Sequence, residues 1–151
     1  MGRVQHCTFR LNGLHLGLEV LRVQEVLRHV AVTRVPRAPA SVAGLINLRG
    51  RIVTAVDLRS RFGFAPRNDG RPSINVVIRT PEGPVALLAD EIGDVEDVDA
   101  EGFEPPPDTL DGEARRLIRG AYKLENGLLL VLDADAAVDA DVAAGDGRSR
   151  R

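Results

Sequence analysis

The stretch Gly44-Leu45-Ile46-Asn47-Leu48-Arg49-Gly50-Arg51-Ile52-Val53-Thr54-Ala55-Val56-Asp57-Leu58-Arg59 decides the fold, because it places a polar corner between two apolar runs. The runs 44–48 and 51–57 predict two strands joined by a tight turn at Arg49-Gly50. Gly50 adopts positive φ without steric strain, so it suits that turn. Arg49 is then held at the corner with its guanidinium donors projecting outward. We interpret this corner as a candidate recognition surface.

The N-terminal part of the chain predicts a hairpin. Residues 7–11 and 14–20 alternate apolar and polar side chains, and Asn12-Gly13 between them is the dipeptide that best suits a type I′ turn. With a two-residue loop, one face of the hairpin is wholly apolar and consists of three facing pairs: Leu11 with Leu14, Phe9 with Leu16 and Cys7 with Leu18.

Two short helices are predicted around the central stretch. Asp57 is the expected N-cap of one helical turn, which Gly63 ends. Residues 20–28 shift to helical spacing, since a helix there would gather four apolar side chains on one side: Val20, Val23, Val26 and Leu27.

The second half of the chain predicts further strands. They are expected at 74–79 and 85–89 around a turn at 81–84, at 94–99 as an acidic edge strand, and at 118–124 and 128–132 as a second hairpin around Asn126-Gly127. The strand 128–132 is apolar on both faces, so we expect it to lie centrally in its sheet.

The remaining segments predict connections. Residues 65–73 are rich in turn formers and are expected to form an exposed connection that tolerates insertion. The proline run within 104–108 predicts a stiff loop. Asp133 is expected to cap a short Ala-rich helix, and residues 140–151 have little to bury and predict a disordered tail.

Composition disfavours several classes of function. The 20 basic and 22 acidic residues give a formal charge of −2, and aromatic content is 3% with no Trp, so a dedicated nucleic-acid binder is disfavoured. The single cysteine, Cys7, excludes an internal disulfide and agrees with a reducing compartment. No secretory signal pattern and no apolar run of membrane-spanning length is seen, so we expect a cytoplasmic protein without direct membrane insertion.

The chain shows no recognisable catalytic or metal-binding pattern. His6, His15 and His29 lack metal-ligand spacing and are expected at the solvated surface. The acidic residues within 90–99 lack the spacing of a calcium loop and are expected to form a solvated acidic strand. We therefore expect no metal, no cofactor and no enzymatic activity. The competing hypothesis is a small-molecule hydrolase that uses Asp57, Asp90 or Glu91.

Many short strands with few short helices predict a mainly β chain of closed or nearly closed barrels. The order and spacing of Leu16–Val26, Thr33–Pro36 and the central stretch resemble the CheW-like family of chemotaxis adaptor proteins. The resemblance covers residues 4–138 and is sharpest over 16–63. It implies two small five-stranded SH3-like β-barrels packed side by side with a groove between them, in a CheW-like domain spanning 1–139.

The same resemblance implies a function. CheW-like adaptors couple the cytoplasmic tips of methyl-accepting chemoreceptors to the regulatory domain of a CheA-type histidine kinase, and other CheW-like domains are further possible partners. The alternative is an adaptor of a parallel chemosensory system that controls surface or pilus-based motility. The chain departs from the family pattern at Thr54, Ala86 and Asn126-Gly127.

Glu25 has two interpretations. It either pairs with its neighbours Arg22 or Arg28, or it pairs with Arg49, which the resemblance places beside it near the groove used for partner contact. The resemblance implies a partner-binding surface of seven residues: Val20, Val23, Glu25, Asn47, Leu48, Arg49 and Gly50.

Overall fold

The structure is a computed structural model that describes residues 2–28, 30–110 and 112–138. Its strands are β1 (Arg3–Leu11), β2 (Leu14–Glu19), β3 (Val23–Arg28), β4 (Val42–Leu48), β5 (Arg51–Asp57), β6 (Ile74–Thr80), β7 (Gly83–Ala89), β8 (Glu91–Asp99), β9 (Ile118–Leu124) and β10 (Gly127–Leu132). Its helices are η1 (Val20–Arg22), α1 (Leu58–Phe62), η2 (Ala100–Gly102) and α2 (Gly112–Leu117), with a further helical segment at 134–138.

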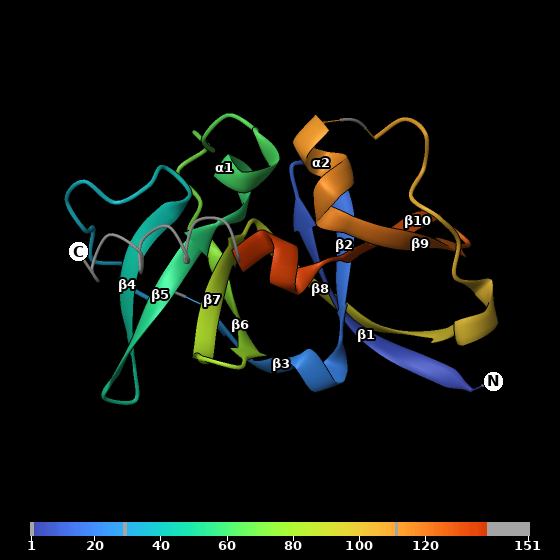
Figure 1. The fold of residues 1–151 in the computed structure, drawn as a ribbon, viewed down its shortest axis with the longest axis horizontal. Coiled ribbons are helices and arrows are strands. Elements are labelled where there is room, and N and C mark those ends of the chain that lie inside the picture. Colours follow the sequence, from blue (N-terminus) through green and yellow to red (C-terminus); the bar gives the residue numbers. More distant parts are fainter. Residues whose placement is uncertain (1, 29, 111, 139–151) are drawn as a thin grey trace.

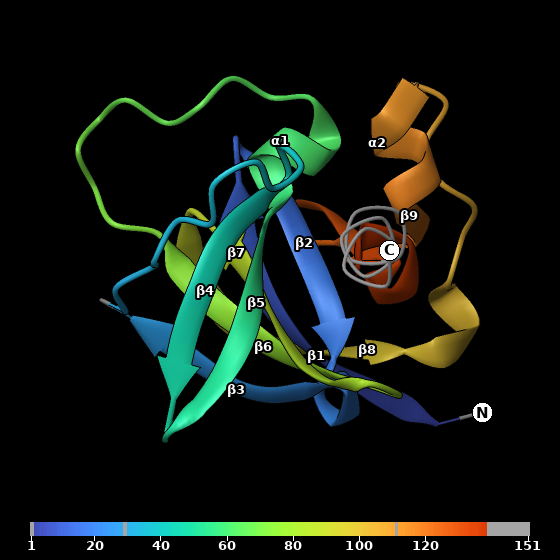
Figure 2. The same ribbon diagram turned by 60° about the vertical axis from the view of Figure 1, so that its left-hand side comes forward.

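The strands form two five-stranded sheets that lie side by side (Figures 1 and 2). Lobe A has the order β8-β1-β2-β10-β9 and lies on the right in Figure 1, and lobe B has the order β3-β6-β7-β5-β4 and lies on the left. In the described residues the two outer strands of each sheet are not paired directly with each other. One isolated bridge joins the open sides of each sheet, Thr33–Leu45 in lobe B and Glu104–Ala121 in lobe A. The predicted mainly β, two-lobed fold is confirmed, although the sheets are not continuous barrels.

A shared core holds the lobes together. The largest cluster of buried side chains draws on both sheets, with Phe9 and Leu16 from lobe A and Val56 and Leu87 from lobe B. Each lobe also has a smaller core of its own, around Val53 in lobe B and Leu129 in lobe A. The lobes therefore share one hydrophobic interior.

Several sequence predictions are confirmed. The first hairpin has the expected register, and Asn12 and Gly13 have φ of 50° and 84°, as a type I′ turn requires. The strands on either side of the Arg49-Gly50 corner are β4 and β5, and β8 is an edge strand. Asp57 accepts a hydrogen bond from the Ser60 N–H, and Gly63 ends α1 in the left-handed conformation. The expected tail lies outside the described residues.

The predicted helix at 20–28 is wrong. Only η1 is helical there, and Val23–Arg28 form an edge strand that pairs with β6. A register shift between Val23 and Glu25 breaks the two-residue alternation, which is why the run imitates helical spacing. So short a helix has little intrinsic stability, and pairing with a neighbouring strand prevails.

The second hairpin is present, but its turn is one residue earlier than predicted. Gly127 pairs with Leu124, so the turn residues are Glu125 and Asn126. Leu129 faces Tyr122, whereas a two-residue turn at Asn126-Gly127 would place it opposite Leu124. Relative to the predicted pairing, each residue of β10 faces a residue of β9 two positions earlier. An even shift leaves the same side chains on the inner face of the sheet. Packing of Leu129 and Tyr122 in the lobe A core outweighs the local preference of Asn-Gly for a turn.

The prediction of surface histidines is wrong for His6. Its side chain is 2% exposed and contacts the Tyr122 ring at 5.4 Å between ring centroids. His6 follows the buried-side pattern of β1, where the edge strand β8 covers it on one side and β2 on the other. His15 is partly buried, and His29 lies outside the described residues.

Candidate functional site

The Arg49-Gly50 corner is a type I′ turn at the tip of the β4–β5 hairpin, which points down and to the left in Figure 1. Arg49 has φ of 53° and Gly50 has φ of 83°. The Gly50 N–H donates to the Asn47 Oδ1 at 2.8 Å, so the asparagine braces the turn. A left-handed conformation is unfavourable by about 1 kcal/mol for a residue such as Arg, compared with Gly or Asn. The backbone conformation at position 49 favours Gly or Asn over Arg. The presence of an arginine there is therefore explained by the contacts of its side chain.

Arg49 pairs with Glu25 through two hydrogen bonds. The Arg49 Nη1 donates to Glu25 Oε2 at 2.5 Å, and Nη2 donates to Oε1 at 2.9 Å. The Arg49 side chain is 75% exposed and the Glu25 side chain 17% exposed. Glu25 therefore orients the guanidinium from beneath, while most of the arginine faces solvent.

The pair also joins the two open sides of lobe B. Glu25 is on β3 and Arg49 follows β4, and these are the first and last strands of the sheet. The nearby bridge between Thr33 and Leu45 links the same two sides. Of the two pairings left open for Glu25, the structure shows the one with Arg49, whereas Arg22 bonds to the Arg79 carbonyl and to Asp135.

The other expected surface residues are placed less uniformly. Val20 in η1 and Val23 at the start of β3 are partly buried, and Val23 packs against the shared core. Leu48 is 7% exposed and belongs to the lobe B core. Strand alternation turns the Leu48 side chain inward, so it offers a partner little side-chain area.

Two exposed apolar side chains beside the expected surface were missed. Leu21 is 84% exposed in η1, and Ile52 is 64% exposed on β5, opposite Asn47. The backbone around Leu21 is fixed, because the Arg79 Nη1 donates to the carbonyls of Leu21 and Val23 at 2.9 and 2.8 Å. Strand alternation predicts that Ile52 is exposed, since Val53 beside it is buried. The exposure of Leu21 could not be predicted, because the segment was assigned to a helix.

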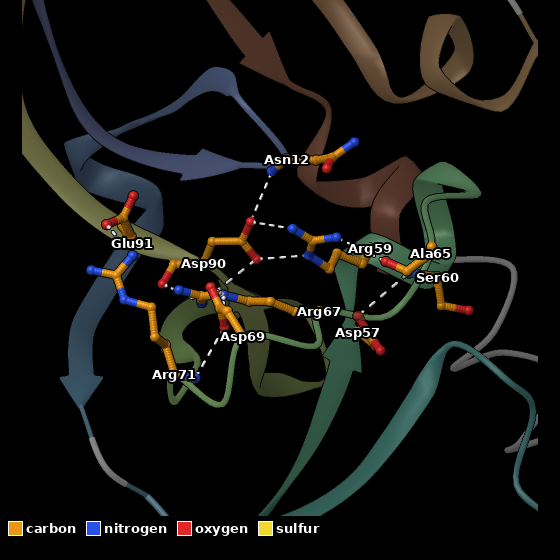
Figure 3. Close-up of polar contacts among 10 residues, drawn as sticks. All are labelled: Asn12, Asp57, Arg59, Ser60, Ala65, Arg67, Asp69, Arg71, Asp90 and Glu91. Carbon is orange, nitrogen blue, oxygen red and sulfur yellow. Dashed lines mark hydrogen bonds and ion pairs between the residues drawn. The ribbon is translucent and has the colours of Figure 1, made fainter.

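A second polar cluster lies where the lobes meet (Figure 3). The Arg59 Nε and Nη2 donate to the two carboxylate oxygens of Asp90 at 2.9 and 2.8 Å, and the Asn12 N–H donates to Asp90 Oδ2 at 2.8 Å. Arg67 reaches the same residue from the 65–73 connection and donates to its carbonyl at 2.9 Å. Figure 3 shows both arginines converging on Asp90. The cluster joins α1, the first hairpin and the crossover between β7 and β8.

Asp90 is therefore a partly buried structural anion and not part of a solvated strand. Burial alone would raise its pKa, but hydrogen bonds from Arg59 and Asn12 and the charges of Arg59 and Arg67 outweigh burial and lower the pKa below its ordinary value. The Asp90 hydrogen bond also raises the pKa of Arg59. The other carboxylates of the hydrolase hypothesis have structural partners as well, because Asp57 caps α1 and Glu91 lies 3.6 Å from Arg71.

The described residues hold no group of three or more His, Cys, Asp or Glu side chains arranged to bind a metal ion. No helix among them is both long and apolar enough to cross a membrane.

Two lobes that share one core, with a braced charge pair on a projecting hairpin, define the class as a two-lobed β binding module. The chain belongs to the CheW-like domain family, whose model matches residues 5–142. A solved structure, the scaffolding protein TtCheW from Thermoanaerobacter tengcongensis, superposes with a TM-score of 0.82 at 26% identity and covers 93% of this chain and 95% of that one.

Curated relatives agree. The probable chemotaxis protein CheW of Rhizobium etli is 26% identical over 85% of this chain and 83% of its own length. Protein FrzA of Myxococcus xanthus is 28% identical over 73% of this chain and 69% of its own length.

Proposed function

We propose that this chain is a non-enzymatic chemotaxis adaptor that couples the cytoplasmic tips of chemoreceptors to the regulatory domain of a CheA-type histidine kinase. The observation that carries the proposal is the Arg49–Glu25 pair. Arg49 has an unfavourable backbone conformation, and the largely buried carboxylate of Glu25 holds its exposed guanidinium in place. This arrangement suits recognition more than stability.

The proposed surface combines direction with contact area. The hydrogen bonds to Glu25 use two of the five N–H donors of Arg49, and the others remain for a partner. Apolar area comes from the exposed Ile52 and Leu21 and from the exposed part of Val20. Buried apolar anchors contribute most of the affinity of such interfaces, whereas a charged group fixes orientation.

Simultaneous binding of a receptor and a kinase explains how an adaptor can influence kinase activity without catalysing a reaction itself. A kinase tethered beside a receptor encounters it at a high effective concentration. If the receptor state changes the affinity of one contact, linkage changes the other contact by the same free energy.

The proposal is tested by assembling the complex from its parts. The chain is mixed with a receptor-tip fragment, a kinase regulatory domain or both, and the masses of the resulting particles are measured by light scattering after size exclusion. A particle that contains all three components supports the adaptor. Binding of only one partner, or binding in which each excludes the other, contradicts it.

The alternative is an adaptor of a parallel chemosensory system for surface or pilus-based motility. The same surface serves either output, so the partners discriminate between them. Parallel binding measurements with receptor tips from a flagellar and a non-flagellar cluster of the same organism decide the question by their relative affinities.

We also expect no turnover of ester, phosphate or glycoside substrates above the buffer rate, because the candidate carboxylates are engaged in structural contacts. Hydrolysis is followed by release of a chromogenic product. A rate that disappears with Asp57→Asn, Asp90→Asn or Glu91→Gln would establish the hydrolase hypothesis instead.

A further inference from the structure

The chain repeats one five-strand unit: the first unit is β1 to β5 and the second unit is β6 to β10. Adding one constant to the residue number, which we call the first shift, maps β1, β2 and β3 onto β6, β7 and β8. The strand register is retained: the pair Leu11–Leu14 maps onto Thr80–Gly83, and the pair Cys7–Val95 has the counterpart Val76–Val26. A slightly larger constant shift, the second shift, maps β4 and β5 onto β9 and β10; the matching pairs are Leu48–Arg51 with Leu124–Gly127, and Ala55–Ala86 with Val131–Gly17.

The repeat extends to the helix that follows each unit. Asp57 accepts from the Ser60 N–H at 3.4 Å, and Asp133, its counterpart by the second shift, accepts from the Ala136 N–H at 3.0 Å. Each aspartate therefore caps the helix that begins directly after the last strand of its unit.

The repeat also extends to the bridge that spans the open side of each lobe. A Cβ added to Gly44 would lie 2.2 Å from the Thr33 carbonyl oxygen, and one added to Gly120 would lie 2.5 Å from the Glu104 carbonyl oxygen. Only glycine admits the bridging segment at these two equivalent positions. Such agreement in register, capping and close approach is not expected of two unrelated sheets.

The units do not coincide with the lobes. Lobe A takes β1 and β2 from the first unit and β8, β9 and β10 from the second, while lobe B takes β6 and β7 from the second unit and β3, β4 and β5 from the first. Four strand ladders join the units: β1 with β8, β2 with β10, β3 with β6 and β5 with β7. Each unit has exchanged two strands with the other.

We infer that residues 1–70 and 71–151 are complementary halves, each of which is the binding partner of the other. Alone, either half supplies two strands of one lobe and three of the other, so it completes neither sheet. The shared core divides in the same way, since Leu16 and Val56 come from the first half and Leu87 and Leu130 from the second. A separated half exposes this apolar surface and cannot offset its conformational entropy.

Polar contacts add specificity to the interface between the halves. Arg61 of the first half donates to the carbonyls of Ala136 and Ala137 in the second half at 2.7 and 3.0 Å. The Arg59–Asp90 pair crosses the same interface, with both side chains less than a fifth exposed. Arginine forks on fixed acceptors set the register of the two halves.

One connection joins the halves in the chain, and it is only partly free. The predicted exposure of 65–73 is confirmed for most of the segment, but Arg67 is anchored to Asp69 and to the Asp90 carbonyl, with its side chain 12% exposed. Gly70, in contrast, has φ of 74° and open space around it. A cut between Gly70 and Arg71 therefore leaves the Arg67 anchor in place.

The test uses the full chain with a protease recognition sequence inserted between Gly70 and Arg71. We expect the cut protein to elute as one particle of the intact mass and to keep the circular dichroism spectrum of the uncut variant. Its thermal midpoint should rise with protein concentration, because unfolding now separates two chains, whereas the midpoint of the uncut variant should not. Elution as two folded particles, or a midpoint that does not depend on concentration, would overturn the inference.

A reassembly experiment provides the second measurement. The cut halves are separated in urea and returned to buffer either alone or mixed in equal amounts. The mixture should regain the native spectrum, and each half alone should remain unfolded. A half that refolds alone to a stable native sheet would show that the repeat unit is an independent domain and would contradict the exchange. The uncut variant must first match the parent chain in thermal midpoint, which separates damage by the insertion from failure of the halves to assemble.

Discussion

The corner of lobe B and its counterpart in lobe A share a hairpin register but differ in turn backbone and in charge, because Arg49 and Gly50 have positive φ whereas their counterparts Glu125 and Asn126 do not. Arg49 corresponds to Glu125 by the second shift, and Glu25 corresponds to Asp94 by the first shift. Lobe B therefore carries an arginine–carboxylate pair across its open side, and lobe A carries two carboxylates at the matching positions. The fold provides two corners, and side-chain chemistry makes only one of them a braced guanidinium.

The two crossovers between the lobes also occupy matching positions and differ in their side chains. Asp90 lies on the β7–β8 crossover with its side chain 12% exposed, and its counterpart Leu21 on the β2–β3 crossover is 84% exposed. The helix after each unit supplies one partner of an ion pair, but with opposite charge. After the first unit Arg59 pairs with Asp90, and after the second unit Asp135 pairs with Arg22. One crossover braces the lobes from inside, and the other presents an apolar side chain to solvent.

The largest expected effect tests the difference between the crossovers. Asp90→Ala should lower the free energy of unfolding by about 1.5 to 3 kcal/mol, because the partly buried Arg59 loses two charge-assisted hydrogen bonds and keeps only the Ala65 carbonyl as an acceptor. Asp135→Ala, which breaks the more exposed Arg22–Asp135 pair at the other crossover, should change the free energy of unfolding by less than about 1 kcal/mol. Urea denaturation of both variants measures this, and equal losses would show that the crossovers are energetically alike.

The second prediction concerns the corners. Arg49→Asn should weaken receptor or kinase binding by about 1 to 3 kcal/mol and change the stability by less, since asparagine suits the positive φ that arginine tolerates poorly. Glu125→Gln is the matched control at the other corner and should leave binding unchanged. Calorimetric titration gives the affinities, and thermal unfolding gives the stabilities.

A double-mutant cycle of Arg49→Asn with Glu25→Gln shows whether the pair acts in recognition or in folding. Coupling in binding but not in unfolding supports recognition. Coupling confined to unfolding would reduce the pair to a clasp across the open side of lobe B. Coupling in both makes it a structural brace that also shapes the interface.

A smaller effect is expected from His6, whose counterpart in lobe B is Asn75 by the first shift. Burial lowers the pKa of His6 below its ordinary value of 6.5, and this outweighs the charge of Glu19 and the hydrogen bond with the Val4 backbone, which act in the opposite sense. Below pH 6.5 the unfolded chain therefore binds more protons than the folded chain, so stability falls as the pH falls, by at most about 1.4 kcal/mol per pH unit.

Replacing His6 with the residue that lobe B carries isolates this effect. His6→Asn should flatten the dependence of the unfolding free energy on pH as the pH falls below 6.5. His15→Asn serves as the comparison, because burial and then the charge of Arg10 also lower the pKa of His15. If His6→Asn leaves the slope unchanged, the buried imidazole does not account for the acid sensitivity.

Local signals predicted much of the fold. The Asn12-Gly13 turn, the Arg49-Gly50 corner and the Asp57 cap each depend on residues close in sequence, and all three were anticipated. The β3 strand was not, because a bulge removes its alternation and its pairing partner β6 is distant in sequence. Long-range pairing of this kind leaves little trace in a short sequence window.

The candidate site was anticipated to a similar extent. Composition and turn chemistry pointed to Arg49, and the family resemblance pointed to Glu25, but burial of Leu48 and exposure of Leu21 depend on how the strands pair. The repeat has little trace in the sequence, because its two copies share hairpin register, helix caps and close approaches but few side chains, and their turns differ in conformation. The two shifts that relate the copies become visible only when the ladders are known.

The smallest expected effect concerns the segment that follows the second unit. Deletion of residues 140–151 should leave the thermal midpoint and partner affinity nearly unchanged, because its Ala, Asp, Gly and Arg residues offer almost no large apolar surface to bury. The deletion begins after Asp133 and the helical segment at 134–138, so it retains the cap and the carbonyls that accept from Arg61. A shorter chain ending at residue 133 is the contrasting variant and should be clearly less stable, since it removes the buried Ala137 and Val138 from the shared core. If the first deletion lowers the midpoint as much as the second, the segment packs on the lobes and the second unit extends beyond the helix that ends the repeat.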